Sequence, residues 1–134
     1  MIVNPRGEPA QETLEQFRQS GPGTILVSPS FGTGYDFMGE LCEWQIICKI
    51  PFDPPSRILK AREELDPEYR NYRAMNKLWQ YYGRIGRSKE DAGETVILDS
   101  HMDWFWRRNK HLAPAYAHRV YREVAVLPPP PPKL

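Results

Sequence analysis

The sequence predicts an α/β domain in which helices are layered on a mostly parallel sheet. Three runs have the length and the β-branched, apolar character of strands, and they cover residues 24–28, 44–50 and 94–99. Segments with helix-start signals separate these runs, and such alternation is typical of α/β layers. The runs are apolar almost without interruption, which predicts strands that are covered on both faces.

The first helix is expected between Glu8-Pro9 and Gln19, since proline suits an early helical position. Gly21-Pro22-Gly23 ends this helix before the first of the three strands. Residues 1–3 also have strand character but are cut off at the very start of the chain. We therefore expect a sheet that is truncated at its N-terminal edge.

Two more helices are expected between the second and third strands. Pro54-Pro55-Ser56 breaks the chain and caps a helix over residues 57–65, and Asp66-Pro67-Glu68 is a second start signal. Apolar side chains at spacings of three and four then predict a buried face on the helix that follows. Its members are Tyr72, Met75, Trp79 and Tyr82.

Length and composition predict one domain with a short tail. The 134 residues are enough to bury a core, and we assign residues 1–125 to the domain and 126–134 to the tail. Five consecutive prolines in the tail favour polyproline II, with docking into an aromatic groove as the alternative to plain disorder. Charged residues are 26% of the chain at a net charge of +1, so any polyanion site must be a local patch.

The sequence favours a reducing compartment, either the cytoplasm or a nucleus. No apolar run approaches membrane-spanning length, and the N-terminus has no signal-peptide core. Two cysteines, Cys42 and Cys48, cannot make a disulfide framework or a four-thiolate metal site. Because Cys48 lies in an apolar run, we expect its thiol to be buried.

A glycine loop follows the first of the three strands. Residues 28–37 contain two glycines, several hydroxyl groups and one acid, Asp36. Ligands of open parallel sheets collect at the carboxyl ends of strands, which is where this loop begins. The loop has neither the Walker A pattern nor the dinucleotide fingerprint, and by itself it is an ordinary turn.

The end of the long helix carries a second polar cluster. Gln80, Arg84 and Arg87 are spaced by three and four residues and therefore share one helix face. Gly83 removes bulk from the same turn, so an anion can come close to the backbone. An amide and two guanidinium groups suit a phosphate chain, whereas a solvated basic helix end is the alternative.

Together, the loop and the helix end resemble the second motor domain of superfamily-two helicases of the XPD/DinG type. The family's motif V contains Gly-x-Asp-Phe, which Gly34, Asp36 and Phe37 match. Its motif VI reads Gln-x-x-Gly-Arg-x-x-Arg-Ser-x-x-Asp-x-Gly, and residues 80–93 match it. The resemblance covers roughly residues 1–120. It implies a RecA-like three-layer fold with a mostly parallel sheet.

The resemblance also implies roles for individual residues. The implied catalytic set is Gln80, Arg84 and Arg87, with the two arginines acting as arginine fingers on the γ-phosphate of ATP. The implied nucleotide-binding set is Gly34, Asp36 and Gly83. Ser30 and Thr33 are implied to lie near the nucleic-acid backbone. An arginine that is supplied in trans can contribute about three to five decades to the rate of phosphoryl transfer.

The groups that grip the nucleotide in this family are not found in the sequence, which has no Walker A lysine and no Asp-Glu-x-His box for Mg²⁺. The resemblance assigns them to a first RecA-like motor domain, so ATP and Mg²⁺ are expected only when that partner completes the motor. Single-stranded nucleic acid, in this family DNA, is the second expected partner. The alternative is a non-catalytic module, derived from a helicase domain, that binds nucleic acid or a protein.

Other candidate sites have less support. The three histidines and Asp103 do not have the spacing of a compact zinc site, so no metal site is expected. Residues 102–108 predict a short helix that contains Trp104-Phe105-Trp106. We expect the tryptophans to pack on the sheet, and stacking on nucleic-acid bases is the alternative.

Overall fold

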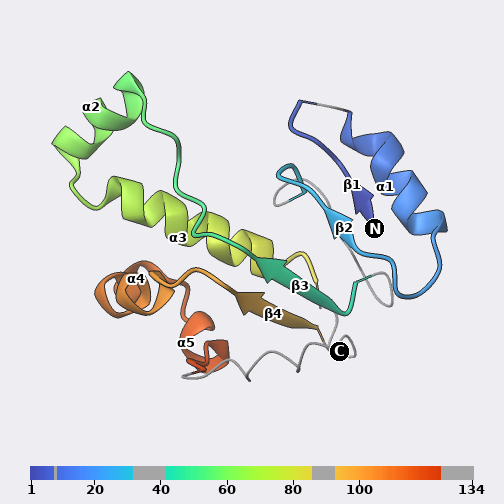
Figure 1. Cartoon of the computed structure of the whole chain (residues 1–134). Coiled ribbons are helices and arrows are strands. Elements are labelled where there is room, and N and C mark those ends of the chain that lie inside the picture. Colours follow the sequence, from blue (N-terminus) through green and yellow to red (C-terminus); the bar gives the residue numbers. More distant parts are fainter. Residues whose placement is uncertain (8, 32–41, 86–92, 125–134) are drawn as a thin grey trace, which may run out of the picture.

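The computed structural model describes residues 1–7, 9–31, 42–85 and 93–124, in which helices and strands alternate (Figure 1). The strands are β1 (Ile2–Val3), β2 (Leu26–Val27), β3 (Trp44–Ile47) and β4 (Glu94–Ile97). The helices are α1 (Ala10–Gln19), α2 (Arg57–Leu65), α3 (Tyr69–Tyr82), α4 (Met102–Asn109) and α5 (Ala117–Val120), with a 3-10 turn, η2 (Lys110–Leu112). None of the helices in these ranges is long and apolar enough to cross a membrane.

Two pairs of parallel strands form the sheet layer. β1 pairs with β2, with Ile2 opposite Leu26, and β3 pairs with β4, with Trp44 opposite Glu94. Parallel neighbours need a crossover connection, which α1 supplies for the first pair and α2 with α3 for the second. The α/β part of the prediction is confirmed, although each strand is shorter than the apolar run that predicted it.

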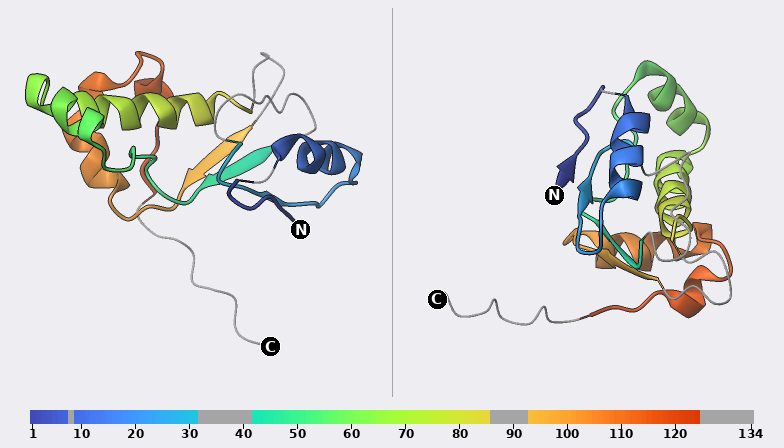
Figure 2. Two further views of the ribbon diagram at one scale, coloured as in Figure 1. Left: turned by 90° about the horizontal axis from the view of Figure 1, so that it is seen from above. Right: turned by 90° about the vertical axis from the view of Figure 1, so that its right-hand side faces the viewer.

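Within the described residues, helices cover only one side of the strands. Both views of Figure 2 place α1 and α3 on the same side. Strand side chains that face the other way are exposed, including Val3 at 52%, Val27 at 47% and Ile46 at 46%. The prediction of strands covered on both faces is therefore wrong for this part of the chain. It forms two layers, and the third layer of the predicted RecA-like fold is not seen there.

Cys48 lies next to this open face and is exposed, so the prediction of a buried thiol is wrong. Successive residues of a strand point to opposite faces, and Ile47, between Ile46 and Cys48, is the one that is buried. An apolar run indicates that both faces tolerate burial. It does not indicate which face another element covers.

The main core lies between α3, α4 and the strands β3 and β4. Its buried residues on α3 are Ala74, Met75, Leu78 and Trp79. Met75 and Trp79 are therefore confirmed as core, whereas Tyr72 is 46% exposed and its predicted burial is wrong. The buried face is centred closer to residues 74 and 78 than the aromatic spacing indicated. From α4, the fully buried Phe105 meets the ring of Phe52 edge-on, at 5.4 Å between centroids.

Local signals set the ends of the helices. Ser56 caps α2, since its Oγ accepts a hydrogen bond from the backbone N–H of Leu59 at 3.0 Å. Asp66 ends α2, and its carboxylate accepts from the N–H of Glu68, just before α3 begins. Gly23 has a φ of +84°, a left-handed conformation that favours glycine, in the turn between α1 and β2.

Asp53 holds the connection between β3 and α2 against α3. Its carboxylate accepts a hydrogen bond from Arg73 Nε at 2.9 Å and another from Lys77 Nζ. The hydrogen bond from Arg73, followed by that from Lys77, lowers the pKa of Asp53. This ion pair fixes a proline-rich segment that has no regular secondary structure of its own.

Asp99 ties the carboxyl ends of β3 and β4 together. Its Oδ2 accepts from the backbone N–H of Ile50 at 3.0 Å, and its Oδ1 accepts from that of His101 at 2.9 Å. The hydrogen bond from Ile50 is the main cause of a lowered pKa for the Asp99 carboxyl. The charged form of Asp99 is therefore the form that the fold stabilises.

Asp99→Asn is expected to weaken the dependence of the free energy of unfolding on pH at acidic pH. The folded pKa of Asp99 lies below the unfolded value of about 4, so its contribution is present above that value and is lost as the pH falls through the folded pKa. Urea unfolding from about pH 2 to about pH 7 measures this dependence. Glu64→Gln, an exposed change on α2, is the control, and an unaltered pH dependence in Asp99→Asn would refute the role.

Candidate functional site

The end of α3 presents the described part of the predicted catalytic set. The N–H of Gly83 donates to the carbonyl of Trp79 at 3.1 Å, and that of Arg84 donates to the carbonyl of Tyr81 at 3.0 Å. The helical turn therefore continues past the last residue of α3. Gln80 is exposed and Arg84, two residues past the end of α3, is half-buried.

Gly83 adds no side chain to this turn. Its φ is −71°, a value that any residue can adopt. A Cβ atom at this position would lie 3.5 Å from the carbonyl oxygen of Trp79 and 3.7 Å from that of Gln80, which is ordinary contact. Neither the backbone conformation nor the described neighbours demand a glycine here. Its effect is to leave out a side chain between Gln80 and Arg84.

The segment after α3 packs against the loop after β2. Ile85 is 5% exposed and lies in one buried cluster with Phe31 of the loop and Leu14 of α1. Arg84 directly precedes Ile85 in the chain, and Ser30 directly precedes Phe31. Two segments that are far apart in the sequence, each of which carries predicted site residues, therefore meet in the fold.

Gly93 permits this packing. A Cβ atom at Gly93 would lie 3.1 Å from Cδ1 and 3.2 Å from Cγ1 of Ile85. These distances are shorter than ordinary van der Waals contacts, so a larger residue would have to displace the Ile85 side chain. Gly93 is the last glycine of the motif VI pattern, and its packing gives that position a physical role.

Ser30 is the described member of the predicted nucleic-acid contacts. Its backbone N–H donates to Ser28 Oγ at 3.0 Å, and Ser28 Oγ donates to Asn4 Oδ1 at 2.9 Å. Sequence reasoning missed Asn4. The available signal was a polar residue directly after the apolar run that forms β1, at the edge where ligands of parallel sheets collect.

Four of the predicted site residues lie outside the described part of the chain. They are Thr33, Gly34, Asp36 and Arg87. Their roles stay predictions from the sequence. The proline-rich tail, residues 126–134, lies outside it as well, and so does the predicted boundary at residue 125.

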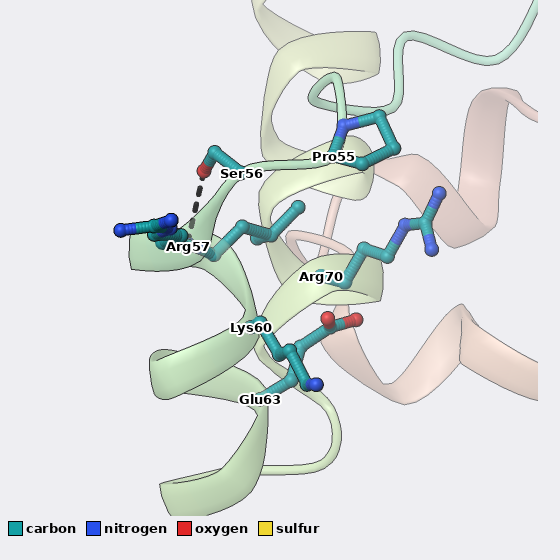
Figure 3. A pocket seen from close by; sticks show the side chains of 7 residues that line it. Pro55, Ser56, Arg57, Lys60, Glu63 and Arg70 are labelled. Atoms are coloured by element: carbon teal, nitrogen blue, oxygen red, sulfur yellow. Dashed lines mark hydrogen bonds between the residues drawn. The ribbon is translucent and has the colours of Figure 1, made fainter.

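A hollow of about 420 Å³ lies between α2 and the start of α3 (Figure 3). It is lined by Pro55, Ser56, Arg57, Leu59, Lys60, Glu63 and Arg70. In Figure 3 the guanidinium groups of Arg57 and Arg70 extend to opposite sides. The cations therefore do not converge on a common point, and the hollow does not have the arrangement of an anion site.

Two of the histidines pair with separate carboxylates. His101 Nδ1 lies 3.2 Å from Asp99 Oδ1, and His111 Nε2 lies 2.6 Å from Glu68 Oε1. Among the residues that the structure describes, no three side chains of histidine, cysteine, aspartate or glutamate gather closely enough to hold a metal ion.

The aromatic run in α4 divides between core and surface. Trp106 stacks on Tyr121, with ring centroids 4.3 Å apart, and Phe105 is fully buried. Trp104 is 53% exposed, with the guanidinium of Arg108 5.4 Å from its ring centroid. The prediction that the tryptophans pack on the sheet is wrong for Trp104, whereas Trp106 is partly buried against the core, where its ring meets those of Trp79 and Tyr121.

Comparison with known proteins links residues 1–115 to one family, since they match the profile of the helicase C-terminal domain. The chain is 34% identical over 100 residues to the ATP-dependent DNA helicase YoaA of Escherichia coli, covering 68% of this chain and 16% of that protein. It is 31% identical over 114 residues to the XPD/RAD3 helicase subunit of general transcription and DNA repair factor IIH of Saccharomyces cerevisiae, covering 74% of this chain and 15% of that protein.

A third relative is the ATP-dependent DNA helicase DinG of Photobacterium profundum. It is 33% identical over 90 residues, which cover 58% of this chain and 13% of that protein. The chain thus spans between 13% and 16% of the length of these three relatives. The profile match includes both segments that meet at Ile85 and Phe31.

Proposed function

Because this chain belongs to the helicase C-terminal domain family, as the C-terminal motor domain of an XPD/DinG-type helicase, we propose that it forms half of an ATP-dependent DNA motor. The other half is a first RecA-like motor domain, which holds ATP and Mg²⁺. This chain contributes Gln80, Arg84 and Arg87 to the triphosphate, and a track for single-stranded DNA. The proposed setting is the cytoplasm or a nucleus.

One observation carries the proposal. Ile85 and Phe31 share a buried cluster, so the helix end with Arg84 and the loop with Ser30 are neighbours. A motor must couple a change at the nucleotide to a change at the nucleic acid. Coupling of this kind needs packed elements between the two sites, and this cluster joins the segments to which those two roles are assigned.

The chemistry at the nucleotide requires positive charge and close approach. Phosphoryl transfer depends mainly on positioning and on neutralising charge that is spread over the phosphate oxygens, and a guanidinium group can donate two parallel hydrogen bonds to them. Gly83 adds no side chain beside Arg84, which suits an approaching phosphate. We assign Gly34, Asp36 and Gly83 to the nucleotide side of the interface.

Mg²⁺ is assigned to the partner and not to this chain. The ion prefers carboxylate and phosphate oxygens, and no group of three potential ligands gathers among the described residues. The sequence also has no Walker A lysine. Ser30 and Thr33 are assigned to the DNA backbone, where short hydroxyl side chains can donate to phosphate oxygens.

The purified chain is expected to show no ATP turnover above the buffer rate, with or without single-stranded DNA. The reason is that the groups which hold the triphosphate and Mg²⁺ belong to the partner. A coupled phosphate-release assay measures the rate. Addition of a separately expressed first motor domain is expected to produce DNA-stimulated hydrolysis. Appreciable Mg²⁺-dependent turnover by the chain alone would contradict the assignment of the triphosphate and Mg²⁺ sites to the partner domain.

The alternative function is a non-catalytic module that binds nucleic acid or a protein. It predicts binding of single-stranded DNA that weakens steeply with salt, because phosphate contacts release counterions. It also predicts no gain in ATP hydrolysis when the first motor domain is added. Both functions allow DNA binding, so the hydrolysis assay with the added first motor domain is the one that separates them.

A further inference from the structure

Asn4 is a buried polar side chain that connects separate elements of the fold. Two polar side chains are buried among the described residues, Asn4 at 0% and Asn109 at 4% exposure. Asn109 donates to the carbonyl of Phe105 within its own helix. Asn4 follows β1, and its backbone N–H donates to the carbonyl of Val27, which extends the pairing of β1 with β2 (Figure 1).

The side chain of Asn4 makes two hydrogen bonds in different directions. Its Nδ2 donates to Thr13 Oγ1 of α1 at 3.4 Å, and its Oδ1 accepts from Ser28 Oγ at 2.9 Å. Ser28 Oγ also accepts from the backbone N–H of Ser30 at 3.0 Å. A hydroxyl has one proton to donate, so once it is given to Asn4, the oxygen lone pairs face the N–H of Ser30.

We propose that Asn4 is a positioning residue for the contact that Ser30 makes with single-stranded DNA, an inference that rests on the proposed function. Asn4 orients the Ser28 hydroxyl, and that hydroxyl fixes the backbone of Ser30. The next residue, Phe31, is anchored in the buried cluster, so Ser30 is held from both sides.

The hydroxyl group of Ser30 is the part that remains for a ligand. Its backbone N–H is already used by Ser28, and its Oγ makes no hydrogen bond to the part of the chain that the structure describes. Ser30 is half-buried, so its side chain can reach solvent. A donor with a fixed backbone loses less conformational entropy when a phosphate binds than a donor on a free loop.

The two hydrogen bonds of the Asn4 side chain can be removed separately or together, which gives a matched set of variants. Ser28→Ala removes the hydroxyl that bonds to Asn4 Oδ1 and to the N–H of Ser30. Thr13→Val removes only the hydrogen bond from Asn4 to α1 and almost preserves the shape of the side chain. Asn4→Leu removes both. The affinity for a fluorescein-labelled oligothymidylate is measured by anisotropy, at a temperature at which thermal unfolding shows every variant to be folded.

Ser28→Ala and Asn4→Leu are expected to weaken binding about fivefold, which is the size of one lost hydrogen bond, and Thr13→Val less than about twofold. Hydrogen exchange at the Ser30 amide is expected to accelerate in the first two variants and to stay unchanged in Thr13→Val. The hydrogen-exchange measurement needs no ligand. If Asn4→Leu does not fold, the comparison of Ser28→Ala with Thr13→Val tests the positioning role.

The outcomes separate this role from the proposed function. Failure of the wild-type chain to bind the oligonucleotide overturns the proposed function. Wild-type binding that Ser28→Ala leaves unchanged overturns the positioning role alone. Weakening by Thr13→Val as large as that by Ser28→Ala overturns it too, since Asn4 would then act only as part of the scaffold.

Discussion

Alanine at position 87 is expected to reduce DNA-stimulated ATP hydrolysis about 10³-fold or more when the chain is combined with a first motor domain. The proposed function places Arg87 at the γ-phosphate, where negative charge spreads over the oxygens in the transition state. Loss of the guanidinium group removes that stabilisation and leaves ATP binding to the partner domain. The measurement is single-turnover hydrolysis at saturating DNA.

Two further variants make the test specific. Arg87→Lys keeps the charge but loses the planar guanidinium that matches phosphate oxygens. Its hydrolysis rate is therefore expected to be reduced nearly as much as that of Arg87→Ala. Arg62→Ala removes an exposed arginine of α2 and is expected to leave the rate unchanged. Full activity in Arg87→Ala, or equal losses in Arg87→Ala and Arg62→Ala, would defeat the role assigned to Arg87.

Alanine at position 105 is expected to lower the free energy of unfolding by about 3–5 kcal/mol. Phe105 is fully buried and meets Phe52 edge-on, with centroids 5.4 Å apart, in the core between α3, α4 and the strands. Its removal leaves a cavity that the close-packed surroundings fill only in part. Domains of this size are stable by about 5–15 kcal/mol, so the variant is expected to be close to unfolding. Urea titration followed by circular dichroism measures the change.

The neighbouring residue is the matched control. Trp104 is 53% exposed, and the guanidinium of Arg108 lies 5.4 Å from its ring centroid. Trp104→Ala is expected to cost less than about 1 kcal/mol, the size of an exposed cation–π contact. The loss of unfolding free energy in Phe105→Leu is expected to lie between those of Phe105→Ala and Trp104→Ala. A larger loss in Trp104→Ala than in Phe105→Ala would show that the core is not where the structure places it.

Local signals explain why most of the elements were predictable. Ser56 caps α2 with a hydrogen bond to a residue three positions on, and Gly23 supplies the left-handed turn that precedes β2. Such interactions involve neighbours in the chain, so the sequence contains them directly. The start signal at residues 66–68 is local in the same way, since the carboxylate of Asp66 accepts from the N–H of Glu68 in the turn that leads into α3.

Burial was harder to predict, because it depends on what covers each face. Tyr72 fits the spacing of the buried stripe of α3 but lies at its edge and is exposed. Cys48 belongs to an apolar run but points away from the helix layer. For Tyr72 the helical period was right, and its place at the edge of the buried face left it exposed. For Cys48 the uninterrupted apolar run predicted burial on both faces, and the helices cover only one of them.

The order of residues along the chain was enough to predict α1 to α4, the parallel strands and the common turn of Gln80, Gly83 and Arg84, since each depends on residues a few positions apart. Only the tertiary structure showed that Ile85 packs on Phe31 and that Asn4 reaches Ser28. These contacts join segments that are distant in sequence. No local pattern specifies which distant side chain will fill a given space, because that depends on how whole elements pack against one another.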